Sequence, residues 1–195
     1  MLFSVSFTQE IPKHQFAWKV LGAVLDATGR KSEAVDANQT AVALSPQDAE
    51  VHNNLGVTLQ KLGRLDEAIA SCRQAIALKP DFATAHSNLG NTFHEQGRLD
   101  EAEASLRQAI ALQPDLAEAH FNLATMKKFS SEDEQCLQMR LLYRDPDTSE
   151  KSRCYICFAL AKAYEDLREF ARAFQLYTEA NALRRKELGY NAAQD

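Results

Sequence analysis

Residues 49–82 read AEVHNNLGVTLQKLGRLDEAIASCRQAIALKPDF, and residues 83–116 follow as ATAHSNLGNTFHEQGRLDEAEASLRQAIALQPDL. Aligned without a gap, the two segments are identical at 22 of their 34 positions. Self-similarity at a fixed period of this length indicates an array of small structural repeats. The rest of the chain can therefore be divided by the same period.

Prolines and glycines carry the period toward the N-terminus. Pro12, Pro46, Pro80 and Pro114 follow one another at intervals of 34 residues. Six of the seven glycines occupy two fixed places in the repeat: Gly22, Gly56 and Gly90, then Gly29, Gly63 and Gly97. Proline ends a helix, and glycine after a helix C-terminus suits a tight turn. Each repeat is therefore predicted to hold two helices and a turn.

One face of each predicted helix carries small, apolar or ring-bearing residues. In residues 49–82 these are His52, Leu55, Gly56, Leu59, Ala68 and Ala75. At about 100° per residue each set falls in one arc of its helix, and stacking against neighbouring repeats would bury that arc. The pattern recurs in residues 15–48 and 83–116 and resembles the tetratricopeptide repeat (TPR) family. The resemblance implies an all-α fold, a right-handed superhelical solenoid of antiparallel helix pairs.

We expect residues 1–195 to form a single TPR solenoid. Its expected parts are a half-repeat at 1–14, regular repeats at 15–48, 49–82 and 83–116, a degenerate repeat at 117–150, and a C-terminal repeat with an extended helix at 154–187. In the degenerate repeat, Ser131-Glu132-Asp133-Glu134 predicts a capping box that opens a helix through Tyr143. Asp145-Pro146-Asp147 should end that helix.

The final repeat departs from the pattern at its turn and at its end. A helix start is expected at Thr148 or Ser149, and Arg168 stands where the earlier repeats have a turn glycine. No proline closes the repeat, so its second helix is predicted to continue toward Gly189. Such an end suits a capping unit or a junction to a further segment.

Composition narrows the partners and the compartment. The net charge is −5, and the absence of a Lys/Arg block argues against nucleic acid or an anionic membrane surface as the main partner. No run approaches the roughly 20 apolar residues of a membrane helix, and the N-terminus lacks the features of a signal peptide. Four cysteines do not make a disulfide framework and favour a reducing compartment. We expect a cytoplasmic protein.

Two sets of metal-binding residue types have structural interpretations. His52, His86 and His120 recur once per repeat, roughly 10 Å apart, whereas zinc needs ligands within about 2.1 Å. Cys154 and Cys157 form a CxxC inside a helical pattern with no second pair, so buried thiols are expected. No phosphate loop, nucleophile motif or carboxylate pair is visible. The sequence therefore predicts no catalytic residue, no metal site, no cofactor and no enzyme.

The positions that differ between the two best repeats cluster on one side of the first helix, opposite its packed face. They include Glu50, Asn53, Val57, Gln60 and Lys61 in one repeat and Thr84, Ser87, Asn91, His94 and Glu95 in the next. A surface that reads a ligand would vary in this way, and so would a solvated face that drifts. In TPR proteins this side lines the groove that receives peptides, which favours binding.

Asn54, Asn88 and Asn122 stand at the edge of that side in three successive repeats. An amide can donate to and accept from a peptide backbone, and the row resembles the asparagine ladder of O-linked N-acetylglucosamine transferases. The alternative is that each Asn satisfies a neighbouring turn. The predicted peptide-binding residues are Asn54, Asn88, Asn122, Asn53, Asn91, Glu50, Gln60, Ser87 and His94. A basic clamp for chaperone carboxylates is not expected, because Lys19 is isolated.

Three functions remain open at this point. The first is a non-catalytic protein–protein interaction module that binds a peptide or protein segment in a concave groove. The second is the substrate-selecting repeat region of a larger transferase, because residues 157–190 resemble the stretch that joins such repeats to a sulfotransferase domain, and the earlier repeats resemble those preceding it or a glycosyltransferase. The third is a self-associating scaffold, a homo-oligomer in which a second copy completes the half-repeat.

Overall fold

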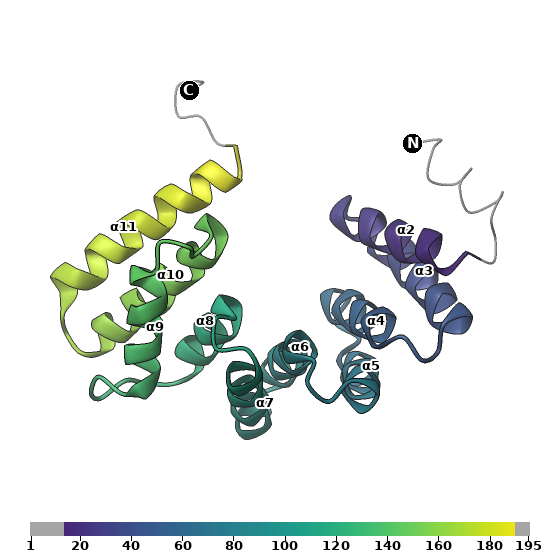
Figure 1. Ribbon diagram of the computed structural model, residues 1–195, viewed down its shortest axis with the longest axis horizontal. Coiled ribbons are helices and arrows are strands. Elements are labelled where there is room, and N and C mark those ends of the chain that lie inside the picture. The colour runs from purple at the N-terminus through teal and green to yellow at the C-terminus, as the bar shows by residue number, and fades with distance from the viewer. Residues whose placement is uncertain (1–13, 190–195) are drawn as a thin grey trace. The chain divides into compact units, whose positions relative to one another are not determined.

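The computed structural model describes residues 14–189, which form ten α-helices and no strand (Figure 1). The regular repeats hold α2 (Gln15–Ala27) and α3 (Lys31–Leu44), α4 (Ala49–Lys61) and α5 (Leu65–Leu78), and α6 (Ala83–Glu95) and α7 (Leu99–Leu112). The later helices are α8 (Ala117–Met126), α9 (Glu134–Arg144), α10 (Glu150–Asp166) and α11 (Phe170–Glu187). The predicted all-α fold is confirmed. The half-repeat predicted at residues 1–14 lies almost wholly outside the described residues.

The chain divides into two compact units, Met1–Ala102 and Glu103–Asp195, with the boundary inside α7. In the first unit consecutive helices pack in order, α2 on α3, α3 on α4, α4 on α5 and α5 on α6. The first helices of successive repeats also touch, since α2 contacts α4 and α4 contacts α6. Each helix therefore gains its burial from its neighbours in the chain, as in a repeat stack.

A left-handed residue ends the first helix of each regular repeat. Gly63 has a φ of +75°, and the amide that follows it, Arg64 N, donates to Leu59 O at 3.0 Å. Gly29 and Gly97 have the same conformation. This geometry satisfies a carbonyl that the helix leaves open, and it turns the chain into the second helix.

Close approach of helices explains the small residues of the packed face. Ala68 and Ala75 of α5 have no exposed surface. A Cβ added to Gly56 would lie 2.7 Å from Cys72 Sγ and 3.3 Å from Ala68 O. A side chain at position 56 would therefore push α4 away from α5, which accounts for a glycine inside a helix.

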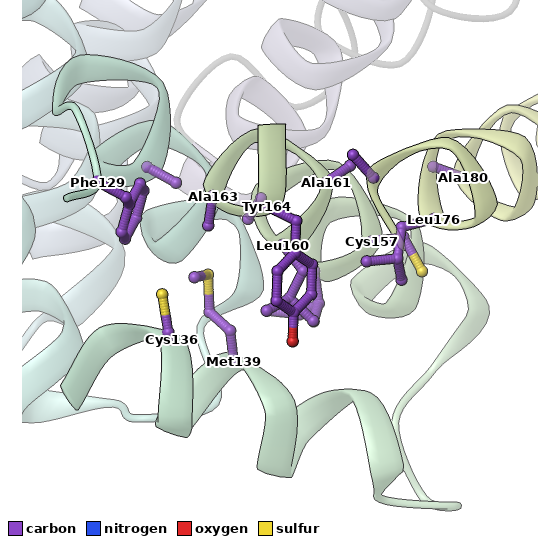
Figure 2. Close-up of a cluster of buried hydrophobic side chains, with 14 of the residues drawn as sticks. Phe129, Cys136, Met139, Cys157, Leu160, Ala161, Ala163, Tyr164, Leu176 and Ala180 are labelled. Atoms are coloured by element: carbon purple, nitrogen blue, oxygen red, sulfur yellow. The ribbon is translucent and has the colours of Figure 1, made fainter. Parts of the chain in front are cut away.

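The second unit contains a cluster of buried side chains centred on α10 (Figure 2). Figure 2 shows Phe129, Cys136 and Met139 beside Leu160 and Tyr164 of α10. Helix α9 packs mainly on α10 and barely touches α8, its partner in the expected repeat. The degenerate repeat thus differs from a regular helix pair because its second helix is held by the next repeat.

The ends of the later helices partly correct the sequence-based expectations. Asp133, not Ser131, caps α9, and its carboxylate accepts from Cys136 N at 3.1 Å. The helix ends at Arg144, as the Asp145-Pro146-Asp147 segment predicted. Of the two expected starts for α10, the structure has Ser149, whose Oγ accepts from Ser152 N at 3.1 Å.

The C-terminal part differs from the regular repeats in its second helix and in its turn. Helix α11 continues to Glu187 and has 18 residues, compared with 14 in α5. Arg168 replaces the turn glycine yet keeps its conformation, with a φ of 63°. None of the helices within residues 14–189 is both long and apolar enough to cross a membrane.

Candidate peptide-binding surface

The predicted binding residues differ widely in exposure. Glu50 and His94 are exposed, and Gln60 is half-buried. Four asparagines are half-buried: Asn54, Asn88, Asn91 and Asn122. Asn53 and Ser87, by contrast, are only 6% and 3% exposed, so the expectation that their side chains lie on the open surface is wrong.

Asn53 is buried because the first helix of the next repeat covers it. Its Oδ1 accepts a hydrogen bond from Asn88 Nδ2 at 2.8 Å, across the contact between α4 and α6. Ser87 holds the same repeat position as Asn53 and is equally enclosed. On this part of the helix wheel, side chains point toward the following repeat rather than toward solvent. Asn88 therefore has a structural partner, which is a side chain of the preceding repeat and not the neighbouring turn that the alternative to the ladder named.

Several of the variable residues on this side contact each other across repeats. The pairs are Lys19 with Glu50, Asp26 with Lys61, and Gln60 with Glu95, whose Nε2 and Oε1 lie 2.9 Å apart. Two pairs join opposite charges, and the third joins an amide to a carboxylate. The residue at one position thus depends on its partner in the neighbouring repeat, which explains part of the variation without a ligand. The opposite signs of Asp26 and Lys61 were the sequence signal for this pairing.

Asn54 lies at a depression of about 160 Å³ in the first unit, and four of the seven residues that line it have polar side chains. We call it the Asn54 depression; its lining residues are Gly22, Ala23, Asp26, Asn38, Asn54, Val57 and Thr58, from α2, α3 and α4. Its floor is hydrogen-bonded, because Asn38 Nδ2 donates to Thr58 Oγ1 and that hydroxyl donates to Asn54 O, each at 2.9 Å. Asn38 was not predicted from the sequence. Its repeat position is held by Cys72 and Leu106 in the next two repeats, so a polar residue there is an exception to the pattern.

One acceptor of the Asn54 depression remains open to a ligand. Asp26 Oδ1 is buried, and no donor within residues 14–189 reaches it, whereas Oδ2 of the same carboxylate pairs with Lys61. Gly22 lets the Asn38 amide pack closely against α2, since a Cβ at position 22 would lie 2.2 Å from Asn38 Oδ1. Buried acceptors without a donor are uncommon in folded proteins, and such an atom invites a donor from outside.

Asn122, the third asparagine of the predicted ladder, belongs to the second unit, whereas Asn54 and Asn88 belong to the first. Its Nδ2 is buried and has no acceptor in the part of the chain that the structure describes. Each of the three asparagines thus has a different environment. A peptide-binding role for the set stays a prediction.

The histidines of the repeats have structural roles, as expected. His52 Nε2 lies 2.9 Å from Pro46 O, and His86 and His120 contact Pro80 and Pro114 in the same way at 3.1 and 2.9 Å. A carbonyl oxygen only accepts, so each Nε2 carries the proton in this contact. Among the described residues no group of three or more His, Cys, Asp or Glu side chains could hold a metal ion.

The cysteines are free and buried, which confirms the structural interpretation of the CxxC. Both of its thiols lie in α10, and burial raises the pKa of Cys157 to about 12. Burial likewise raises the pKa of Cys154, whose Sγ donates to Ala180 O at 3.4 Å. A nucleophilic or metal-binding cysteine needs a lowered pKa, so these two serve the core.

Comparison with known proteins agrees with this architecture. Two models described as tetratricopeptide repeat match residues 47–115 and 156–189, and one described as TPR repeat matches residues 24–63. No curated protein matches the sequence. Among solved structures, a crystal structure of MamA has a TM-score of 0.58 at 18% identity, covering 96% of this chain and 88% of that chain.

Two shorter solved domains are also similar. The first TPR of Spaghetti (RPAP3), bound to an HSP90 peptide, has a TM-score of 0.56 at 22% identity and covers 57% of this chain and 89% of its own. The second TPR domain of human RPAP3, in complex with an HSP70 peptide, has a TM-score of 0.54 at 24% identity, with coverage of 57% and 92%. At these identities the likeness shows a shared fold. Together with the three family models, it shows that the chain is a tetratricopeptide-repeat protein.

Proposed function

We propose that this protein is a non-catalytic interaction module that binds a peptide or protein segment on the side of α2, α4 and α6 that carries the Asn54 depression. The observation that carries the proposal is the depression itself, which contains a buried carboxylate oxygen that no described donor reaches. Asn91 and Gln60, half-buried on the same helices, add amides that can bond to a peptide backbone.

The solved neighbours support peptide binding as a capacity of this architecture. The two RPAP3 domains are bound to the peptides SRMEEVD of HSP90 and SGPTIEEVD of HSP70. Both peptides end in an acidic sequence. In the present chain Lys19 is occupied by Glu50 and lies 3.8 Å from Asp48, so we do not expect its ammonium to receive a peptide carboxylate. We therefore expect a ligand of different chemistry.

Selection from a random peptide display library on the immobilised chain would test the proposal, followed by calorimetric titration of the enriched peptides. The surface variant Asn54→Ala/Asn91→Ala should weaken binding about tenfold or more, because each lost hydrogen bond contributes about 0.5–1.5 kcal/mol. The control Gln74→Ala/Gln108→Ala removes two exposed amides from α5 and α7 and should leave binding unchanged. No enrichment, or equal loss in both variants, would argue against this binding surface.

Self-association is a second candidate, favoured by one observation in the second unit. Phe170 and Phe174, one helical turn apart on α11, are 64% and 72% exposed. Exposed aromatic pairs of this kind often mark contact sites. Light scattering over a range of concentrations should then show a dimer that Phe170→Ser/Phe174→Ser abolishes, and a monomer at every concentration would exclude it. The transferase alternative stays a sequence-based prediction.

A further inference from the structure

We infer that the Asn54 depression binds a neutral primary carboxamide, the side chain of an Asn or Gln in the bound segment. The inference rests on the proposed function and specifies what one subsite of it recognises. Asp26 Oδ1 is the starting point, because a buried carboxylate oxygen without a donor gains a charge-assisted hydrogen bond from any N–H that reaches it.

The charges around the depression select against an ionic ligand. Asp26 is the one charged residue among those that line it, and Lys61 pairs with the other oxygen of the same carboxylate. The local charge is thus balanced before a ligand arrives. Because Lys61 already neutralises Asp26, an incoming ammonium or guanidinium would add a second positive charge near Lys61, and an incoming carboxylate would meet the negative charge of Asp26. A neutral donor avoids both.

The polar groups of the depression match a donor and an acceptor on the same ligand. A primary carboxamide has two N–H donors and one carbonyl, and Asn54 presents an amide of the same kind. In the proposed arrangement one ligand N–H bonds to Asp26 Oδ1, and Asn54 Nδ2 donates to the ligand carbonyl. A hydroxyl also donates and accepts, but from a single oxygen atom, whereas a carboxamide presents its donor and its acceptor on separate atoms. The volume of about 160 Å³ suits a small planar group.

A polar floor under the helix glycine occurs in the first regular repeat and not in the second. In the first repeat Gly22 faces Asn38, whose amide forms the polar floor with Thr58. In the second repeat the equivalent Gly56 faces Cys72, an apolar thiol. Asn38→Cys therefore converts the first repeat to a pairing that this chain already accommodates, which makes it a matched variant with an expected native fold.

The test uses N-acetyl-asparagine methylamide as a probe and follows the side-chain amide signals of Asn38 and Asn54 by NMR. We expect saturable shifts in the millimolar range, and binding at least tenfold weaker for the Asp and Lys analogues of the probe. N,N-dimethylacetamide, which lacks N–H donors, should not produce these shifts. Equal shifts from it, or from the charged analogues, would overturn the inference.

Two variants complete the test on the full chain. Asp26→Ala should weaken probe binding roughly tenfold or more, since a hydrogen bond to a charged group contributes about 1.5–3 kcal/mol. Asn38→Cys removes the hydrogen bond to Thr58 that forms the floor of the depression, so it should weaken probe binding as well, to a smaller extent. Asp36→Ala removes an exposed carboxylate of α3 and should change nothing. Selected peptides that bind equally well to Asp26→Ala would refute the carboxamide site and leave the proposed function standing. Probe binding without any selected peptide would support the carboxamide site and argue against the proposed function.

Discussion

His120 is the single histidine of the second unit and has no exposed surface. Burial lowers the pKa of His120 below its ordinary value of 6.5, and the hydrogen bond to Pro114 O opposes that shift in part. The ring is therefore neutral in the folded chain over a range where an unfolded chain would protonate it. The stability that buried His120 contributes should therefore depend on pH.

We predict that the second unit loses stability as the pH falls below about 6.5 toward the lowered pKa of His120. In that window the unfolded state binds more protons than the folded state, so the free energy of unfolding decreases as the pH decreases. Urea unfolding of the full chain at pH 7.5, 6.5 and 5.5 measures this. His120→Gln should reduce the change in the free energy of unfolding between pH 7.5 and pH 5.5. His86→Gln, at a partly exposed ring with the equivalent bond, is the control, and an unchanged slope in His120→Gln would contradict the prediction.

Arg168 should lower the stability of the chain, because it adopts the left-handed conformation without being glycine. A non-glycine residue there costs about 1–2 kcal/mol, of which glycine would recover part. Arg168→Gly should therefore raise the free energy of unfolding by up to about 1 kcal/mol in a denaturant titration. The reciprocal change Gly63→Arg should lower it by about 1–2 kcal/mol, and equal stability of both variants with the parent would show that the turn is not strained.

Among the helices, α9 departs furthest from the repeat pattern, and its stability should depend on α10. Met139 of α9 has no exposed surface and lies in the cluster around α10 (Figure 2). Leu141 of the same helix, by contrast, is 68% exposed. Met139→Ala should destabilise the chain by about 2–5 kcal/mol, because it leaves a cavity. Leu141→Ala should change stability by no more than about 0.5 kcal/mol. Similar losses for both in thermal unfolding would contradict the observed packing.

The sequence predicts the helices well where the repeat is regular. It predicts helix ends and burial less well where they depend on a helix of another repeat. The positions of Gly63 and Ala68 follow from the period alone, since they serve contacts within one helix pair. The Ser-x-x-Glu spacing predicts Ser131 as the cap of α9, whereas Asp133 caps the helix in the structure, so α9 begins two residues later than predicted. The burial of Asn53 depends on α6, a helix 30 residues further along the chain.

The candidate site was predictable only in outline for the same reason. Asn54 was identified from its recurrence, which a single sequence displays directly. Asp26 and Asn38 were not identified from the sequence. Asp26 matters because one of its oxygens lacks a donor, and Asn38 because it is a polar exception to the repeat pattern. Their proximity requires the contact between α2, α3 and α4. Departures from a repeat, rather than the repeat itself, are therefore the better guide to recognition in this chain.

At the scale of the whole molecule, the two compact units should respond separately to a change in one core. Leu160 has 2% exposure within the cluster of the second unit, and Leu59 has the same exposure within the first. Helices in a solenoid contact mainly their neighbours, so a lost contact should weaken the unit that contains it most. Leu160→Ala, at a cost of about 2–5 kcal/mol, should increase amide exchange chiefly in α9, α10 and α11. Leu59→Ala should do so chiefly in α3, α4 and α5, and uniform loss of protection in either variant would mean that the chain unfolds as one cooperative body.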